Sequence, residues 1–197
     1  MEAKKTKKLS IAEYIQLEEN TNTKHEFHDG EVYAMAGGTI EHGLICGNIY
    51  AALKSTLGKG RCKAINGEVK LHVKASNKFL YPDAMVICGD MERSEKEDTA
   101  LINPSIIIEV LSKSTESYDR GDKFFIYRSI PSLQEYILID QYKYQADIYK
   151  RKNDFWKITR VNGLDSILEV EFLSISIPFA AIYEDLRIPT EGLRPGR

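Results

Sequence analysis

This 197-residue sequence lacks a strong excess of charge of one sign. Its 27 lysines and arginines nearly balance its 29 aspartates and glutamates, which gives a net charge of -2. Charge alone therefore does not mark a nucleic-acid or membrane binder, although a local basic groove stays open. No run of about 18 apolar residues occurs, and the basic N-terminal MEAKKTKKLS is not followed by an apolar segment. We expect a cytoplasmic protein without a membrane-spanning segment.

Cysteine is scarce, and the three cysteines (Cys46, Cys62, Cys88) are odd in number, widely spaced and free of any CxxC pair. This pattern argues against a disulfide framework and a structural zinc site, so we expect reduced thiols. Internal repeats are absent too. Hydrophobic residues at 43% and charged residues at 28% are typical of a soluble globular protein. We expect one domain over 10–186, with a basic flexible arm over 1–9 and a flexible tail over 187–197.

Local patterns predict a mixed α/β protein. Ser10 with Glu13 forms a capping box for a short helix, and Asp29-Gly30 between two extended runs predicts an N-terminal hairpin. Helical spacing of apolar residues predicts a long helix. Strands that alternate with helices favour a mixed β-sheet flanked by helices. The expected elements are helices over 11–17, 40–57 and 119–129, strands over 61–65, 68–74, 80–88 and 106–111, and a C-terminal antiparallel meander over 135–139, 144–150 and 155–161.

One residue conflicts with its surroundings. Residues 105–111 read Ser-Ile-Ile-Ile-Glu-Val-Leu, an apolar β-branched run typical of a strand covered on both faces. Glu109 lies in its middle. Because an unpaired buried carboxylate costs several kcal/mol, Glu109 is protonated, or paired with a cation, or at a strand end that opens into a cleft.

A second carboxylate stands at the start of another apolar run. In Tyr81-Pro82-Asp83 the proline opens the strand, where its missing N–H is harmless. If that strand neighbours 106–111, at a spacing of about 4.8 Å, Asp83 and Glu109 can converge on one cation with oxygens at about 2.1 Å. A shared Mg²⁺ would explain Glu109. The alternative is that Asp83 caps a turn and Glu109 pairs with a lysine or arginine.

These residues carry a family resemblance. Pro82-Asp83 followed by Glu109-Val110-Leu111-Ser112 resembles the PD-(D/E)xK motif of restriction-endonuclease-like nucleases. The ordered set HEFHDGEVYAM, EHGLICGNI, YPDAMVI, IIIEVLSKST and DRGDKFFIYRSIPSLQEYILID resembles more closely the Uma-two family of that superfamily, over roughly residues 10–185. The resemblance implies a restriction-endonuclease-like core and an endonuclease that hydrolyses DNA phosphodiester bonds with Mg²⁺ or Mn²⁺. It also implies that the backbone carbonyl of Val110 joins Asp83 and Glu109 as a metal ligand.

The catalytic lysine departs from the simple motif. Two residues after Glu109 stands Leu111, not lysine. The resemblance implies that the following helix supplies this lysine as Lys123, which would position the attacking water or stabilise the pentavalent phosphate. The alternative is an ordinary exposed i,i+4 pair between Asp119 and Lys123.

Two further residues carry over from the resemblance. Glu26, on the first hairpin strand, could add an oxygen ligand to the metal. His42, in the first turn of the long helix, could contact the scissile phosphate or relay a proton, because its unperturbed pKa of about 6.5 suits that task. The alternative for both is a solvated side chain.

Partners are predicted from charge and aromatic residues. Lys70, Lys74 and Lys78 could line one edge of a DNA path, although such charge runs are commonly solvated faces. The meander carries Tyr142, Tyr144, Tyr149, Phe155 and Trp156, more aromatics than one small sheet face normally leaves in water, so we expect a homodimer. A catalytically silent binding or assembly module with the nuclease fold remains the rival hypothesis.

Overall fold

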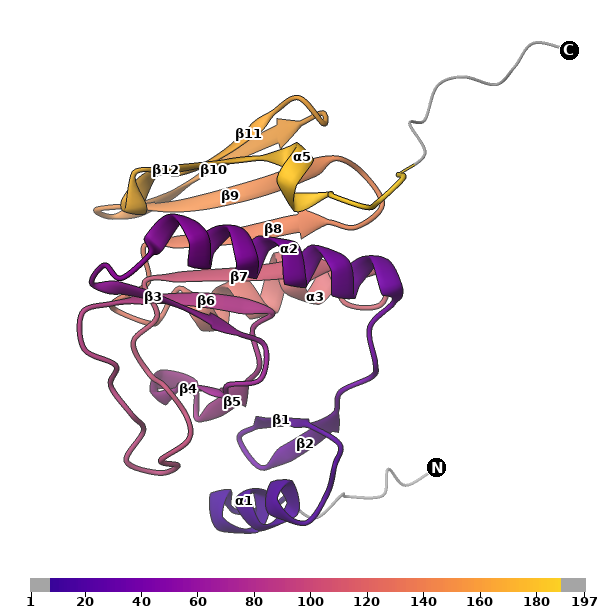
Figure 1. The fold of residues 1–197 in the computed structure, drawn as a ribbon. Helices are drawn as coiled ribbons and strands as arrows, with labels where there is room; N and C mark the ends of the chain where they lie inside the picture. Colours follow the sequence, from indigo (N-terminus) through magenta and orange to yellow (C-terminus); the bar gives the residue numbers. More distant parts are fainter. Residues whose placement is uncertain (1–7, 189–197) are drawn as a thin grey trace, which may run out of the picture.

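The computed structural model describes residues 8–188, so most of the predicted arm 1–9 and tail 187–197 lies outside the described residues. The strands form two sheets and a separate two-stranded hairpin, β11-β12, near the C-terminal end of the described residues (Figure 1). A six-stranded sheet has the order β10-β9-β8-β7-β6-β3, and a four-stranded sheet has the order β2-β1-β5-β4. Strands β7 and β8 are parallel, whereas the other neighbours in the large sheet are antiparallel. The predicted mixed sheet flanked by helices is confirmed.

The smaller sheet carries the predicted hairpin. Helix α1 (Ile11–Glu19) begins at Ser10, whose side chain and that of Glu13 form the expected capping box. Strands β1 (His25–His28) and β2 (Glu31–Ala34) are joined by Asp29 and Gly30, with φ of 50° and 101°. Positive φ at both turn residues is what a tight two-residue hairpin requires. The sheet is completed by β5 (Lys78–Leu80) and β4 (Leu71–Val73), with a 3₁₀ turn, η1 (Lys74–Ser76), between them.

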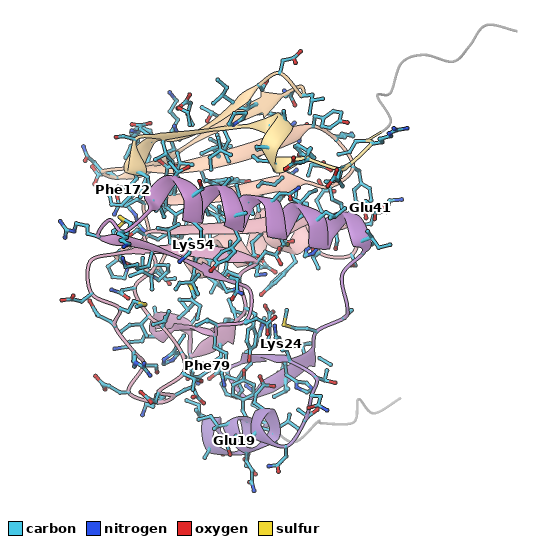
Figure 2. All side chains as sticks on the ribbon, in the orientation of Figure 1. Glu19, Lys24, Glu41, Lys54, Phe79 and Phe172 are labelled. Carbon is cyan, nitrogen blue, oxygen red and sulfur yellow. A yellow bond between two sulfur atoms is a disulfide. The ribbon has the colours of Figure 1, made fainter. Side chains whose placement is uncertain are left out.

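The central strands of the large sheet are covered on both faces. Helix α2 (Ile40–Leu57) packs on one face together with the C-terminal elements, and side chains fill the space between these layers (Figure 2). A helical segment and the β4–β5 pair cover the other face. All residues of β7 are therefore buried, as the apolar run predicted. The bounds are β3 (Cys62–Asn66), β6 (Ala84–Cys88), β7 (Ile106–Leu111), β8 (Glu135–Asp140), β9 (Gln145–Lys152), β10 (Phe155–Asn162), β11 (Ile167–Val170), η3 (Glu171–Leu173), β12 (Ile175–Pro178) and α5 (Phe179–Ile182).

The helix between β7 and β8 is less regular than the sequence predicts. It begins at Glu116 and ends at Tyr127 rather than spanning 119–129. Its middle is a π-helical turn, η2 (Asp119–Lys123), between α3 (Glu116–Tyr118) and α4 (Phe124–Tyr127). Wide turns of this kind are rare and are frequent at functional sites.

Two expectations are corrected by the fold. Cys62 and Cys88 form a disulfide rather than remaining reduced, because β3 and β6 pair antiparallel in a register that places these cysteines opposite each other. Only Cys46 is free among the described residues. In the meander, Tyr149 is buried and Tyr144 and Trp156 are partly buried, which leaves Tyr142 and Phe155 as the exposed aromatics of the predicted set.

None of the helices within residues 8–188 combines the length and the apolar composition that a membrane-spanning helix requires. The cytoplasmic location stays a prediction.

Candidate functional site

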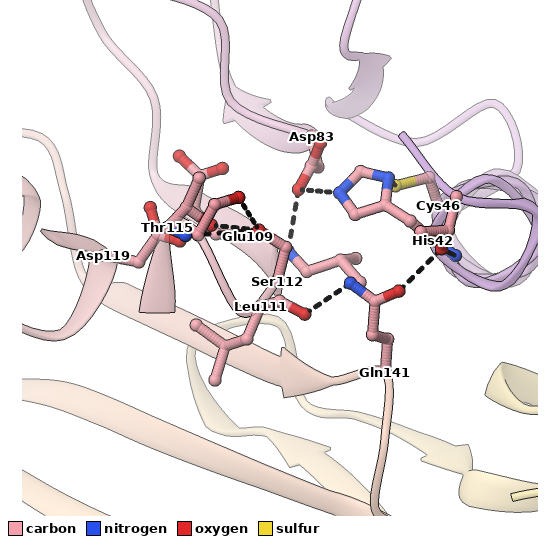
Figure 3. Close-up of polar contacts among 12 residues, drawn as sticks. His42, Cys46, Asp83, Glu109, Leu111, Ser112, Thr115, Asp119 and Gln141 are labelled. Carbon is pink, nitrogen blue, oxygen red and sulfur yellow. Dashed lines mark hydrogen bonds and ion pairs between the residues drawn. The ribbon is translucent and has the colours of Figure 1, made fainter. Parts of the chain in front are cut away.

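The two predicted carboxylates lie on neighbouring strands. Strands β6 and β7 pair antiparallel with Ala84 opposite Ile108, so the next opposed residues are Asp83 and Glu109. Opposed residues of an antiparallel pair direct their side chains to the same face. Asp83 Oδ2 accepts a hydrogen bond of 2.7 Å from the Val110 backbone N–H (Figure 3). Asp83 is one-fifth exposed and Glu109 is almost fully buried, so the pair spans the edge between solvent and core.

Lys123 reaches the same place from the π-helical turn. Its Nζ lies 2.8 Å from Glu109 Oε1 and 3.5 Å from Asp119 Oδ1. The side chains of Lys123 and Asp119 are only 9% and 3% exposed. The alternative of an exposed surface pair is therefore wrong, because this i,i+4 pair faces the interior.

Glu26 and His42 complete the cluster from two other elements. Glu26, on β1, has Oε1 3.8 Å from Lys123 Nζ, and its Oε2 lies 3.3 Å from His28 Nε2. His42, in the first turn of α2, has Nε2 3.3 Å from Asp83 Oδ2. Both side chains are largely shielded from water, so the alternative of solvated groups is wrong for each. Five predicted residues thus converge from both sheets and two helical segments.

Sequence reasoning missed three neighbours of this cluster. Tyr127 donates a hydrogen bond of 2.8 Å from its hydroxyl to Glu109 Oε1. Gln141 donates from Nε2 to the Leu111 carbonyl, and its Oε1 accepts a hydrogen bond from the hydroxyl of Thr39, the residue that caps α2. Tyr127 stands four residues after Lys123, a spacing that could have indicated it. Cys46, the third neighbour, stands four residues after His42, which is the same kind of signal, whereas Gln141 carries none.

Electrostatics set the protonation of the central pair. Burial raises the pKa of Glu109 to about 8, with Asp83 and Asp119 acting in the same direction and the Lys123 ammonium opposing them. Burial disfavours the charged form of Lys123, but Glu109, Glu26 and Asp119 together hold its pKa well above its usual value. The cluster therefore places three carboxyl groups around one ammonium, with Asp83 beside Glu109, and a further cation would stabilise the ionised forms of these carboxyl groups.

The same surroundings shift the pKa of His42. The hydrogen bond with Asp83 raises the pKa of His42, against its partial burial, and a hydrogen bond with the Val110 backbone adds to the increase. Asp83, His42 and the Val110 backbone therefore meet at one point.

The donor atoms suit a hard divalent cation. Two carboxylates on adjacent strands, with the Val110 backbone beside them, offer the oxygen ligands that Mg²⁺ and Mn²⁺ prefer. The excess of carboxyl groups over ammonium groups supports the same fit. Asp83, Glu109 and the Val110 carbonyl would hold such a cation.

Hollows flank the cluster on two sides. One has a volume of about 660 Å³, and His42, Cys46 and Asp83 line it. Gly43 and Gly47 of α2 line it as well, and they add no side chain to it. The other, of about 650 Å³, borders Glu26 on its far side. Its remaining lining residues are His28, Tyr33, Lys78, Tyr118, Asp122, Phe125 and Ile126. Both hollows give a ligand access to the cluster.

The three lysines of the predicted DNA path do not share one edge. Lys70 is mostly buried, with Nζ 3.4 Å from Glu97 Oε2. Lys74 is half exposed and borders a separate hollow, away from the cluster residues. Lys78 lines the hollow beside Glu26, and its Nζ lies 3.1 Å from His28 Nδ1.

Comparison with known proteins gives relatives in sequence and in structure. Two uncharacterized proteins of Synechocystis sp. are 36% identical over 171 residues (86% of this chain, 97% of the relative) and 35% identical over 180 residues (91% and 93%). A crystal structure described as a putative nuclease belonging to DUF820, from Anabaena variabilis, matches with a TM-score of 0.70 at 16% identity. That match covers 88% of this chain and 97% of the other, and it shows that the fold is shared.

The family model described as "Putative restriction endonuclease" matches residues 11–180, nearly the whole chain. The resemblance seen in the ordered motifs is thereby confirmed, and the chain belongs to the Uma2 family.

Proposed function

We propose that this protein is an endonuclease that hydrolyses phosphodiester bonds in DNA with Mg²⁺ or Mn²⁺. The observation that carries the proposal is the contact between Lys123 and Glu109 beside Asp83, at the border of an open hollow. Buried ammonium and carboxyl groups at a cleft edge are typical of catalytic sites rather than of structural ion pairs alone. The nuclease descriptions of the matching family and of the structural neighbour support the same activity.

Each residue has a proposed task. When bound by Asp83, Glu109 and the Val110 carbonyl, Mg²⁺ supplies Lewis-acid chemistry and makes a water molecule easier to deprotonate. Lys123, held by Glu109 and Asp119, orients that water and stabilises the negative charge that develops on the phosphate. Tyr127 fixes the orientation of Glu109 through its hydroxyl. Glu26 lies near Lys123 as well and is the candidate for a further oxygen ligand.

His42 has a proposed role in handling a proton. Its ring contacts Asp83, and both residues line the hollow that would admit the nucleic acid. Because contact with Asp83 raises its pKa, the imidazolium form is favoured at neutral pH and can donate a proton to the leaving oxygen or contact the phosphate.

The substrate path follows the two hollows. We place the scissile strand along the hollow at Asp83 and its continuation in the hollow lined by Lys78, Tyr118 and Phe125. An exposed aromatic ring can stack on a base, and a lysine can contact a phosphate. Lys70 and Lys74 remain weaker candidates because neither borders these hollows.

The test is a Lys123→Met variant assayed for DNA cleavage and for Mn²⁺ binding. Lys123 acts in the transition state, so cleavage should fall on the order of a hundredfold or more while calorimetric Mn²⁺ binding is retained. Lys113→Met is the matched control, because Lys113 is an exposed lysine in the same connection whose Nζ lies over the ring of Tyr142.

Retention of both folding and Mn²⁺ binding separates a catalytic loss from a structural one. Wild-type cleavage by Lys123→Met would refute the assigned role. Absence of cleavage by the wild type, together with equal Mn²⁺ titrations of wild type and Glu109→Gln, would favour the rival binding module.

A further inference from the structure

A sulfur and a nitrogen ligand lie beside the proposed oxygen site. His42 and Cys46 stand four residues apart on α2, so both project from the same face of the helix toward Asp83 (Figure 3). His42 Nδ1 lies 3.5 Å from Cys46 Sγ, and His42 Nε2 lies 3.3 Å from Asp83 Oδ2. One ligand atom from each of the three residues lies within 4.8 Å of the other two.

This geometry is close to that of a tetrahedral metal site. Zinc bonds of about 2.0–2.3 Å to nitrogen, oxygen and sulfur place the ligand atoms roughly 3.3–3.8 Å from one another. The two nitrogens of His42 contact different partners, so its ring must turn to direct one nitrogen at the ion, and ligand atoms that lie up to 4.8 Å apart must move closer together. Room for a water as fourth ligand exists, because the hollow borders all three residues and a Cβ built at Gly43 or Gly47 would meet nothing within 4 Å.

The donor chemistry selects a different cation from the one proposed for catalysis. Thiolate and imidazole suit Zn²⁺ and similar transition metals, whereas Mg²⁺ is bound through oxygen. One thiolate and one carboxylate would also balance the charge of a divalent ion. Burial raises the pKa of the Cys46 thiol, and the negative charges of Asp83 and Glu109, which a cation would offset, act in the same direction.

We propose that His42, Cys46 and Asp83 form a Zn²⁺ site that shares Asp83 with the catalytic metal site and inhibits cleavage when occupied. Binding releases the Cys46 thiol proton to solvent, since the ligand is the thiolate. Zn²⁺ at this place would withdraw Asp83 from the catalytic cation and hold His42 away from the substrate. The inhibitory effect rests on the proposed nuclease function; the binding site does not.

Binding is tested with Co²⁺, which reports a thiolate ligand through a near-ultraviolet charge-transfer band. Wild type should show the band, Cys46→Ser should lose it, and Glu109→Gln should keep it. The band can be assigned to Cys46, because Cys62 and Cys88 are joined in a disulfide and Cys46 is the free thiol among the described residues. His42→Asn should weaken Co²⁺ binding at least tenfold, and unfolding curves verify that each variant is folded.

Absence of the band in wild type, or its persistence in Cys46→Ser, would overturn the site. These outcomes are independent of catalysis, because Mn²⁺ titration of Glu109→Gln tests the catalytic site separately.

The inhibitory effect is tested by adding Zn²⁺ to Mn²⁺-supported cleavage. Cys46→Ser should need at least tenfold more Zn²⁺ than wild type for the same inhibition. Equal inhibition of the two proteins would overturn the regulatory part of the proposal.

Discussion

At the scale of the residue, the environment of Glu109 matches two of the possibilities that its sequence context left open, a cationic partner and a strengthened hold on its proton. It is buried and paired with Lys123, and its cross-strand neighbour Asp83 lines a hollow. Burial keeps its pKa near 8, so the carboxyl holds its proton more strongly than an ordinary glutamate. A cation at Asp83 would favour the ionised form.

The first prediction concerns Glu109→Gln in chelator. An unfolded glutamate releases its proton near pH 4.3, whereas folded Glu109 does so near pH 8. Between these values the folded state binds more protons, so the stabilisation from Glu109 is complete below the unfolded pKa and is lost as pH rises through about 8. The melting temperature of Glu109→Gln relative to wild type should therefore rise from about pH 5 to about pH 9.

Thermal unfolding across this pH range measures the effect, with the exposed Glu68→Gln as control. A pH-independent difference between Glu109→Gln and wild type would contradict the raised pKa.

The sequence indicates only part of this cluster. Asp83 and Glu109 stand out because each is a carboxylate at or within an apolar strand, and Lys123 is indicated by the family motif. Gln141 was missed because its partner is distant in the chain: it contacts Thr39, 102 residues away. Contacts that depend on the packing of separate elements leave no local pattern.

At the scale of the element, the helical segment 116–127 is held against the large sheet by buried charge. Arg120, in the π-helical turn, donates from Nη1 to Asp147 Oδ2 on β9 and from Nε to Glu116 Oε1 at 2.8 Å. Arg160, on β10, binds Asp147 from the solvent side, and Asp147 is only 3% exposed. This triad anchors the turn that carries Lys123.

The second prediction compares the two arginines. Arg120→Ala should lower the free energy of unfolding by about 1–3 kcal/mol, because Asp147 loses its inner partner, and it should also slow cleavage by loosening the Lys123 turn. Arg160→Ala should cost less than about 1 kcal/mol, since its side chain is 55% exposed. Urea unfolding measures both; equal losses would show that the anchor is not the Arg120 contact.

The presence of most helices and strands could be predicted from the sequence, whereas irregularities within them could not. The capping box of Ser10, the Asp29-Gly30 turn and the spacing of 40–57 are local signals, so α1, the hairpin and α2 agree with expectation. The π-helical turn has no signal in residue spacing, because an extra residue in one turn depends on what the helix packs against.

At the scale of the whole molecule, the mixed sheet follows from the strand-helix-strand order, whereas the disulfide does not. Cys62 and Cys88 are 26 residues apart, and only the register of β3 against β6 brings them together. The error in the expectation of reduced thiols therefore came from judging cysteines by spacing alone.

The third prediction is that this disulfide stabilises the fold. Replacing both cysteines by serine should lower the free energy of unfolding by about 2–4 kcal/mol, because the cross-link restricts the unfolded chain. Urea unfolding with and without reductant measures this, and wild type in reductant should approach the double variant. Equal stability of the two proteins without reductant would contradict the cross-link.

The fourth prediction is a homodimer through the free edge of the large sheet. Strand β10 is the terminal strand of that sheet, and it exposes Phe155 and Ile158 by 62% and 57%. Exposed edges with apolar side chains favour pairing with a second chain. Light scattering should give the dimer mass, and Ile158→Lys should shift it toward the monomer. A monomer mass at every accessible concentration would refute the dimer.

The most direct test of the central claim is the anomalous diffraction of a crystal soaked in Mn²⁺. We predict a manganese peak between Asp83 and Glu109, with carboxylate oxygens at about 2.1–2.2 Å and the Val110 carbonyl as a further ligand. A crystal with saturating Mn²⁺, no peak at these carboxylates and Lys123 still 2.8 Å from Glu109 would contradict the metal-dependent nuclease site.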